Sequence, residues 1–260
     1  MISFFTHSGG AGIIRGEQIA KHLGAKLNPK DGYEDDVCIY IKTFPFPFIP
    51  KHTYIDVVED SAGLRWVKNY PEVGIIASSK SIYNYLSNKL PNKIVLILQH
   101  HCNFERVVRT RKEVTVAGII GNRASFDYPL DDLKKRLNEI GMELKVLIKK
   151  RFDSRKEIVN FYKQIDIQLV WRPNSDGILR NPLKLVNAMS FGIPTVAYPE
   201  EDFVSEFDGY FLPAKNIDEL ISDVNNLKGS KAFYRMFPKQ GIQKVKDYHI
   251  NSISKLYFKL

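Results

Sequence analysis

The feature that most constrains the fold of this chain is a regular alternation of Val- and Ile-rich strands with helices. Strands are predicted at 2–8, 92–100 and 114–121, among others, and helices at 12–24 and 129–141. Strands separated by such helices form parallel sheets with crossover connections. A single sheet of about a dozen strands would exceed the usual size, so the sequence predicts an α/β protein with two Rossmann-like domains.

The alternation runs in two blocks, and these blocks set the predicted domain boundaries. The first domain spans residues 1–110 and the second spans residues 113–240, with the boundary near residues 107–113, at the basic stretch RVVRTRK. The polar segment 241–260 has helical character. We expect it to form a C-terminal helix that packs back on the N-terminal domain.

The charge of the chain concerns its partners, because the formal net charge is +9 and the pI is about 9.3. A basic surface attracts nucleotide phosphates, an acidic membrane surface or nucleic acid, and the alternative is a solvated basic face. No apolar run is long enough to cross a bilayer, and the first residues show no secretory leader. With reduced thiols expected at Cys38 and Cys102, we predict a cytoplasmic protein, with peripheral membrane attachment as an extension.

The first candidate ligand loop is THSGGAGIIRG at 6–16, where glycines follow a strand and open a helix. Gly9, Gly10 and Gly12 would let backbone N–H groups approach an anion, whereas a plain tight turn is the alternative. The glycine spacing differs from the dinucleotide GxGxxG, which disfavours a nicotinamide site. His7 lies in the same turn and is a candidate polar or catalytic group.

Two further strand ends carry polar residues. The segment QHHCNFE at 99–105 contains His100. A zinc site would need further ligands at suitable spacing, and none is nearby, so hinge or cleft packing is the favoured role of this segment. The long loop VWRPNSDGILRNP at 170–182 carries Arg172, Asp176 and Arg180, and its length and charge favour a cleft loop over a plain connector.

The fourth strand end precedes a helix that starts near Asn181 and stops at Gly192. Asn181 is the predicted N-cap. Lys184 and Asn187 lie on the one face of the helix that its apolar residues do not occupy. A helix N-terminus, Lys184 and the preceding Arg180 together predict a diphosphate site, with Asn187 placed to bond a ribose hydroxyl. A purely structural helix is the alternative.

In order along the chain, four stretches resemble GT-B glycosyltransferases, close to glycosyltransferase family 4. NAMSFGIPTVA at 187–197 resembles the family signature Glu-Ala-Met-Ala-x-Gly-x-Pro-Val-Val-Ala, with Asn187 in place of the glutamate. FYKQIDIQLVWRPNSDG at 161–177 resembles the strand and loop before it. The stretches 9–25 and 78–107 resemble the glycine loop with its helix and a later helix-strand unit.

This resemblance implies two Rossmann-like domains facing a cleft, with the donor sugar nucleotide on the C-terminal domain and the acceptor on the N-terminal domain. It also implies retention of the anomeric configuration and a UDP-sugar or related donor. Asp176 best matches the first family glutamate, and Arg123 takes the place of the strand-end arginine. Asn187 holds the place of the second family glutamate. Arg180 and Lys184 at the helix start are the other donor-side candidates, and Phe46, Phe48 and His100 are the acceptor-side candidates.

The sequence therefore predicts a glycosyltransferase that uses a nucleoside-diphosphate sugar as substrate and needs neither cofactor nor metal, because no Asp-x-Asp diphosphate handle is present. The acceptor stays open between a saccharide, a membrane surface and DNA. Two alternatives remain: an enzyme that glycosylates modified DNA bases, and a degenerate GT-B protein that only binds. In the loop KTFPFPFIPKH at 42–52, the alternative to acceptor contact is that the phenylalanines complete the core.

Overall fold

The structure of the protein, a computed structural model, describes residues 1–260 except Ser8, Phe46, 59–60, 109–112, 123–124, Arg151, Asp153 and 175–179. The described residues group into two compact units. Unit 1 contains residues 1–100 and 250–260 together with Arg180 and Asn181. Unit 2 contains residues from His101 to Asn174 and from Pro182 to His249. The division falls between His100 and His101, earlier than the boundary expected near 107–113.

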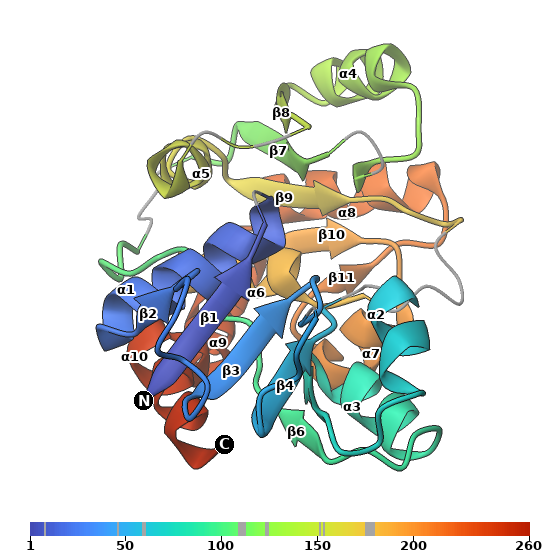
Figure 1. Ribbon diagram of the computed structural model, residues 1–260. Coiled ribbons are helices and arrows are strands. Elements are labelled where there is room, and N and C mark those ends of the chain that lie inside the picture. The colour runs from blue at the N-terminus through green and yellow to red at the C-terminus, as the bar shows by residue number, and fades with distance from the viewer. Residues whose placement is uncertain are drawn as a thin grey trace. The chain divides into compact units, whose positions relative to one another are not determined.

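Unit 1 is built on a parallel sheet of six strands in the order β2-β1-β3-β4-β5-β6 (Figure 1). The strands are β1 (Ile2–Thr6), β2 (Lys26–Leu27), β3 (Val37–Ile41), β4 (His52–Asp56), β5 (Gly74–Ala77) and β6 (Ile94–Leu96). The connecting helices are the π-helix η1 (Gly12–Glu17), α1 (Gln18–Leu23), α2 (Ser61–Val67) and α3 (Lys80–Ser87). Buried hydrophobic side chains of β3, β4, β5 and α3 form one core cluster, since both faces of a parallel sheet are covered.

The C-terminal residues belong to unit 1 as α10 (Ile250–Ile253) and the 3-10 helix η4 (Ser254–Lys259). The ring of Tyr257 packs against Phe4 of β1 with centroids 5.4 Å apart. The Tyr54 hydroxyl donates to the Leu260 carbonyl over 3.0 Å. These contacts bring the end of the chain onto the sheet formed by its beginning.

Unit 2 is built on a parallel sheet of five strands in the order β11-β10-β9-β7-β8. The strands are β7 (Val116–Gly121), β8 (Glu143–Ile148), β9 (Ile167–Val170), β10 (Thr195–Ala197) and β11 (Leu212–Pro213). The helices are α4 (Leu130–Glu139), α5 (Arg155–Tyr162), α6 (Leu183–Ser190), α7 (Glu201–Phe207), α8 (Ile217–Gly229), α9 (Lys231–Lys244) and the 3-10 helix η3 (Lys246–Tyr248). Two buried apolar clusters pack around this sheet.

The predicted fold class, α/β with two parallel-sheet Rossmann-like domains, is confirmed. Two helices that the sequence reasoning omitted, α2 and α7, have seven residues each. Among the described residues, no helix combines the length and the apolar character needed to cross a membrane.

Candidate functional site

The strongest candidate site lies at the carboxyl end of β7, where the first turn of α6 delivers Lys184. Its ammonium group donates hydrogen bonds to the Ile120 carbonyl over 2.5 Å and to the Ser125 hydroxyl over 3.3 Å. Both oxygens are neutral, and they orient the ammonium at the end of the strand. In open parallel sheets, ligands bind at this edge. The predicted cation therefore stands where an anionic ligand of such a sheet would bind.

Gly121 allows this arrangement, and the sequence reasoning did not single it out. Its φ of +150° lies in the range that favours glycine. A Cβ atom at this position would lie 1.9 Å from the Ser125 Oγ and 2.5 Å from the Lys184 Nζ. Only a glycine leaves the space that the ammonium and the hydroxyl occupy. A glycine at the end of a predicted buried strand was the sequence signal for this role.

The start of α6 differs by one residue from the prediction. The helix runs from Leu183 to Ser190 with Pro182 at the N-cap position, which provides no side-chain capping bond, so the predicted cap at Asn181 is wrong. The predicted stop is confirmed, because Gly192 has a φ of +70° just after the helix. The positive end of the helix dipole lies in the same turn as Lys184 and adds to its attraction for anions.

Asn187 does not share the surroundings of Lys184. Its side chain is 8% exposed, and its Oδ1 accepts the backbone N–H of Cys102 over 2.8 Å. The same side chain is hydrogen-bonded to the hydroxyl of Tyr162, whose pKa burial raises well above its usual value. The amide thus bonds protein groups, and its contact to a ribose stays a prediction.

Arg172 at the end of β9 forms a two-pronged ion pair with Glu200 at the end of β10. The Arg172 Nε and Nη2 donate to the two carboxylate oxygens over 2.6 and 2.5 Å, and both side chains are buried. Such a paired geometry satisfies both charges and fixes the two strand ends to each other. Arg172 is therefore a structural member of the loop that the sequence marked as charged.

The predicted residues of unit 1 have unequal surroundings. The Nε2 of His7 lies 2.9 Å from the Thr43 hydroxyl at an exposed position. A Cβ at Gly9 or Gly10 would meet nothing within 4 Å, whereas one at Gly12 would lie 2.3 Å from both the His7 carbonyl oxygen and the Thr6 Oγ1. Gly12 is thus required by close packing, and the two earlier glycines leave open space beside the turn.

The other predicted positions of unit 1 divide between packing and exposure. His100 is buried, and its Nε2 lies 2.9 Å from Gln18 Oε1. Phe48 is 59% exposed, whereas Phe44 stacks on Trp66 with centroids 5.1 Å apart. The aromatic loop therefore packs one half-buried phenylalanine against the core and leaves another in solvent.

Three of the predicted site residues lie outside the described residues: Phe46, Arg123 and Asp176. Arg180 belongs to unit 1, where its carbonyl accepts the Ser79 hydroxyl over 3.3 Å. Among the described part of the chain, no group of three or more His, Cys, Asp and Glu residues is placed to hold a metal ion. The candidate site of unit 2 thus rests on Lys184, Ser125, Gly121 and the start of α6.

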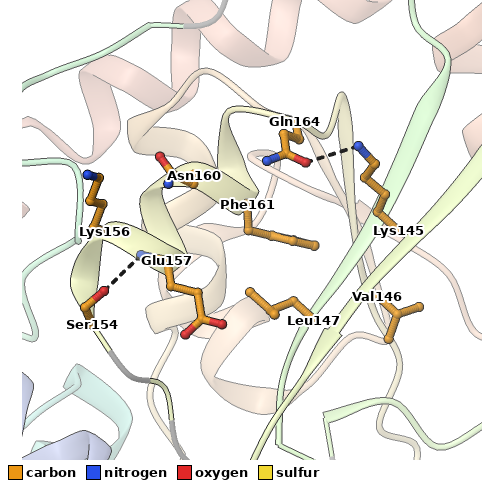
Figure 2. A pocket seen from close by; sticks show the side chains of 9 residues that line it. All are labelled: Lys145, Val146, Leu147, Ser154, Lys156, Glu157, Asn160, Phe161 and Gln164. Carbon is orange, nitrogen blue, oxygen red and sulfur yellow. Dashed lines mark hydrogen bonds between the residues drawn. The ribbon is translucent and has the colours of Figure 1, made fainter.

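A groove of about 530 Å³ lies elsewhere in unit 2, between the edge strand β8 and α5. Figure 2 shows the Lys145 ammonium bonded to Gln164 on one side and Ser154 capping α5 on the other. Its lining contains none of the predicted site residues. It runs along the side of the sheet, so we assign the anion site to the strand ends instead.

A buried pair of histidines, His101 and His249, holds the turn that follows His100, and both residues belong to unit 2. The His101 Nδ1 accepts the Asn103 N–H over 3.2 Å, and its ring lies 5.4 Å from that of His249. Burial, with His249 as a second cause, lowers the pKa of His101 to about 4. The neutral ring is therefore the form that fits the fold.

We expect the free energy of unfolding to decrease as the pH falls from about 6.5 towards 4. Over this range the unfolded chain binds a proton at His101 and the folded chain does not, so the loss reaches roughly 3 kcal/mol. His101→Asn keeps an acceptor near the Asn103 N–H and removes the titration. Urea unfolding at several pH values measures both proteins, and identical pH profiles would contradict the assignment.

Comparison with solved structures finds glycosyltransferases. WaaG, a glycosyltransferase involved in lipopolysaccharide biosynthesis, is 6% identical over 98% of both chains, with a TM-score of 0.66. A glycosyltransferase from Rickettsia africae is 11% identical over 99% of this chain and 96% of that one, with a TM-score of 0.60. A TarM variant from S. aureus, in complex with Fondaparinux, alpha-GlcNAc-glycerol and UDP, is 14% identical over 87% of this chain, with a TM-score of 0.62.

The chain spans about half the length of TarM, since the matches cover 54% and 55% of the two TarM chains. No protein-family model matches the sequence, and no curated protein matches it either. Membership of glycosyltransferase family 4 therefore stays a prediction. At these identities the similarity concerns the fold, and the chain has the two-sheet fold of GT-B glycosyltransferases.

Proposed function

We propose that this protein is a glycosyltransferase that takes a sugar from a nucleoside-diphosphate sugar, with a UDP-sugar as the first choice of donor. The observation that carries the proposal is the Lys184 ammonium at the carboxyl end of β7, held by the Ile120 carbonyl and the Ser125 hydroxyl. The fold supports it, because the similar TarM structure contains UDP. Release of UDP from a panel of UDP-sugars tests the activity, and a protein that only binds would release none.

In this proposal, the bond between the anomeric carbon and the diphosphate oxygen breaks, and the electron pair leaves with UDP. Negative charge grows on that oxygen as the acceptor hydroxyl forms the new bond to the anomeric carbon and releases its proton to solvent. Lys184 and the dipole of α6 stabilise the growing charge at a fixed position. Because both are in place before the reaction, they lose little free energy to reorganisation in the transition state.

We further propose that no metal ion takes part in donor binding. The support is the cationic start of α6, which supplies the positive charge that a metal would otherwise bring to the diphosphate. UDP should raise the melting temperature of the protein equally in EDTA and in magnesium. Stabilisation that appears only with magnesium would contradict this part of the proposal.

Retention of the anomeric configuration is part of the proposal on the strength of the resemblance alone. The anomeric coupling constant of the product, measured by NMR, decides between retention and inversion. For the acceptor we assign unit 1, with His7, the glycine loop and the exposed Phe48 as the positions to vary. Binding of saccharides, anionic vesicles and duplex DNA at two salt concentrations distinguishes the acceptor classes, because polyanion binding falls steeply with salt.

A cytoplasmic location completes the proposal. Cys38 and Cys102 are both free thiols, as expected in a reducing compartment. Cell fractionation tests this location, and an exclusively extracellular protein would contradict it.

A further inference from the structure

A chain of buried hydrogen bonds leads from the centre of the unit 2 sheet to the backbone of Lys184. Gln168 lies in β9 opposite Thr195 of β10 and is fully buried. Its Nε2 donates to the Lys184 carbonyl over 3.0 Å and to the Thr195 hydroxyl over 3.4 Å. An amide thus occupies a strand position that is usually apolar in a parallel sheet.

The other end of Gln168 is satisfied as well. Its Oε1 accepts the Tyr162 hydroxyl over 2.7 Å. Because the Tyr162 proton is used in this bond, the contact between Tyr162 and Asn187 requires the Asn187 amide nitrogen as donor. Asn187 Oδ1 then accepts the Cys102 N–H. The Tyr162 hydroxyl, the Gln168 amide nitrogen and the Cys102 N–H thus each meet an acceptor, as a buried polar network needs.

The hydrogen bonds of Gln168, Tyr162 and Asn187 hold α6 on the side that faces the sheet. Gln168 contacts Lys184 at its carbonyl, whereas the Lys184 ammonium is bound at the end of β7. Lys184 is therefore held at its carbonyl by β9 and at its ammonium by β7. Removing the bond to the carbonyl would free the first turn of α6 while leaving the ammonium and its partners chemically unchanged.

We propose that Gln168 is a positioning residue that holds the first turn of α6, so that the Lys184 ammonium stays at the end of β7. The effect on UDP rests on the function proposed above, but the effect on the position of Lys184 does not. The buried Gln168 would accordingly serve the placement of the cation and not stability alone.

The test compares Gln168→Met with Thr195→Val in the full chain. Methionine matches the length of glutamine and removes its hydrogen bonds. Valine removes only the 3.4 Å bond to the hydroxyl and leaves the bond to the Lys184 carbonyl. The first readout is the NMR signal of the Lys184 ε-methylene group in protein with ¹³C-labelled lysine, assigned with Lys184→Arg. We expect this signal to move in Gln168→Met and to stay in Thr195→Val.

The second readout is the affinity for UDP, measured by calorimetry. Gln168→Met should weaken it about tenfold, and Thr195→Val by less than about twofold. In a Lys184→Met background, Gln168→Met should have almost no further effect, because it acts through the lysine. A merely structural role would lower stability in both backgrounds without this loss of additivity.

The outcomes separate the two proposals. A Lys184 signal that does not move in Gln168→Met overturns the positioning role, whatever UDP does. A moving signal with equal UDP affinity of the wild type and Lys184→Met supports the positioning role and overturns the anion site. If Gln168→Met does not fold, Gln168→Asn replaces it, since its shorter amide cannot reach the Lys184 carbonyl, and the same outcomes apply.

Discussion

Lys184→Ala is expected to lower the rate of UDP release from a UDP-sugar by about 100-fold or more. The change removes a positive charge aimed at the oxygen on which negative charge grows, and the loss of one such donor typically costs this much. Loss of the ammonium's hydrogen bonds to the Ile120 carbonyl and the Ser125 hydroxyl should cost the fold about 1 kcal/mol. Steady-state kinetics and urea unfolding measure the two effects separately.

Lys134→Ala is the matched control for Lys184→Ala, because Lys134 lies exposed on α4 of the same unit. It removes the same charge at a distance from the site and should leave the rate unchanged. The assignment of Lys184 is wrong if both lysine variants react at the wild-type rate. It is equally wrong if unfolding is the chief effect of Lys184→Ala.

Asp56→Ala should lower the free energy of unfolding by about 3–5 kcal/mol. Asp56 at the end of β4 is paired with Arg15 of η1 over 2.5 Å, and both side chains are almost fully buried. Arg15 Nη2 also donates to the Ile97 carbonyl over 2.9 Å. Removing the carboxylate leaves a buried guanidinium without its counter-charge, and that is what makes the loss so large.

The double variant Arg15→Met with Asp56→Leu is the matched comparison. It removes both charges and fills the site with apolar atoms, so it should be more stable than Asp56→Ala alone. Denaturant midpoints of the wild type, Asp56→Ala, the double variant and its two single variants, Arg15→Met and Asp56→Leu, decide this. If the free energy of unfolding falls in the double variant by as much as the sum of the losses in the two single variants, Arg15 and Asp56 are not the coupled pair described above.

The parallel sheets and the end of α6 could be predicted because their signals are local. Alternating strands and helices extend over the whole chain, and Gly192 marks a helix stop through its freedom to adopt positive φ. The short helices α2 and α7 were missed, since two turns carry too little periodicity to be recognised. Local sequence patterns thus predicted the two parallel sheets but not every connecting helix.

The sequence singled out one residue of the candidate site, whose role in donor binding stays a prediction, and did not single out the residues that support it. Lys184 stood out as a cation at a helix start, whereas Gly121 and Gln168 act through partners far away in sequence. Asn187 shows the same limit: helical spacing placed it beside Lys184, but its amide bonds Cys102, 85 residues away. Side-chain partners of this kind depend on tertiary packing, which no local spacing encodes.

A crystal structure of the protein with UDP tests the central claim most directly. The account predicts a diphosphate oxygen within about 3 Å of the Lys184 Nζ, at the carboxyl end of β7 and the start of α6. The claim is contradicted if UDP binds instead in the groove between β8 and α5. It is also contradicted if UDP does not bind at a concentration on the order of millimolar.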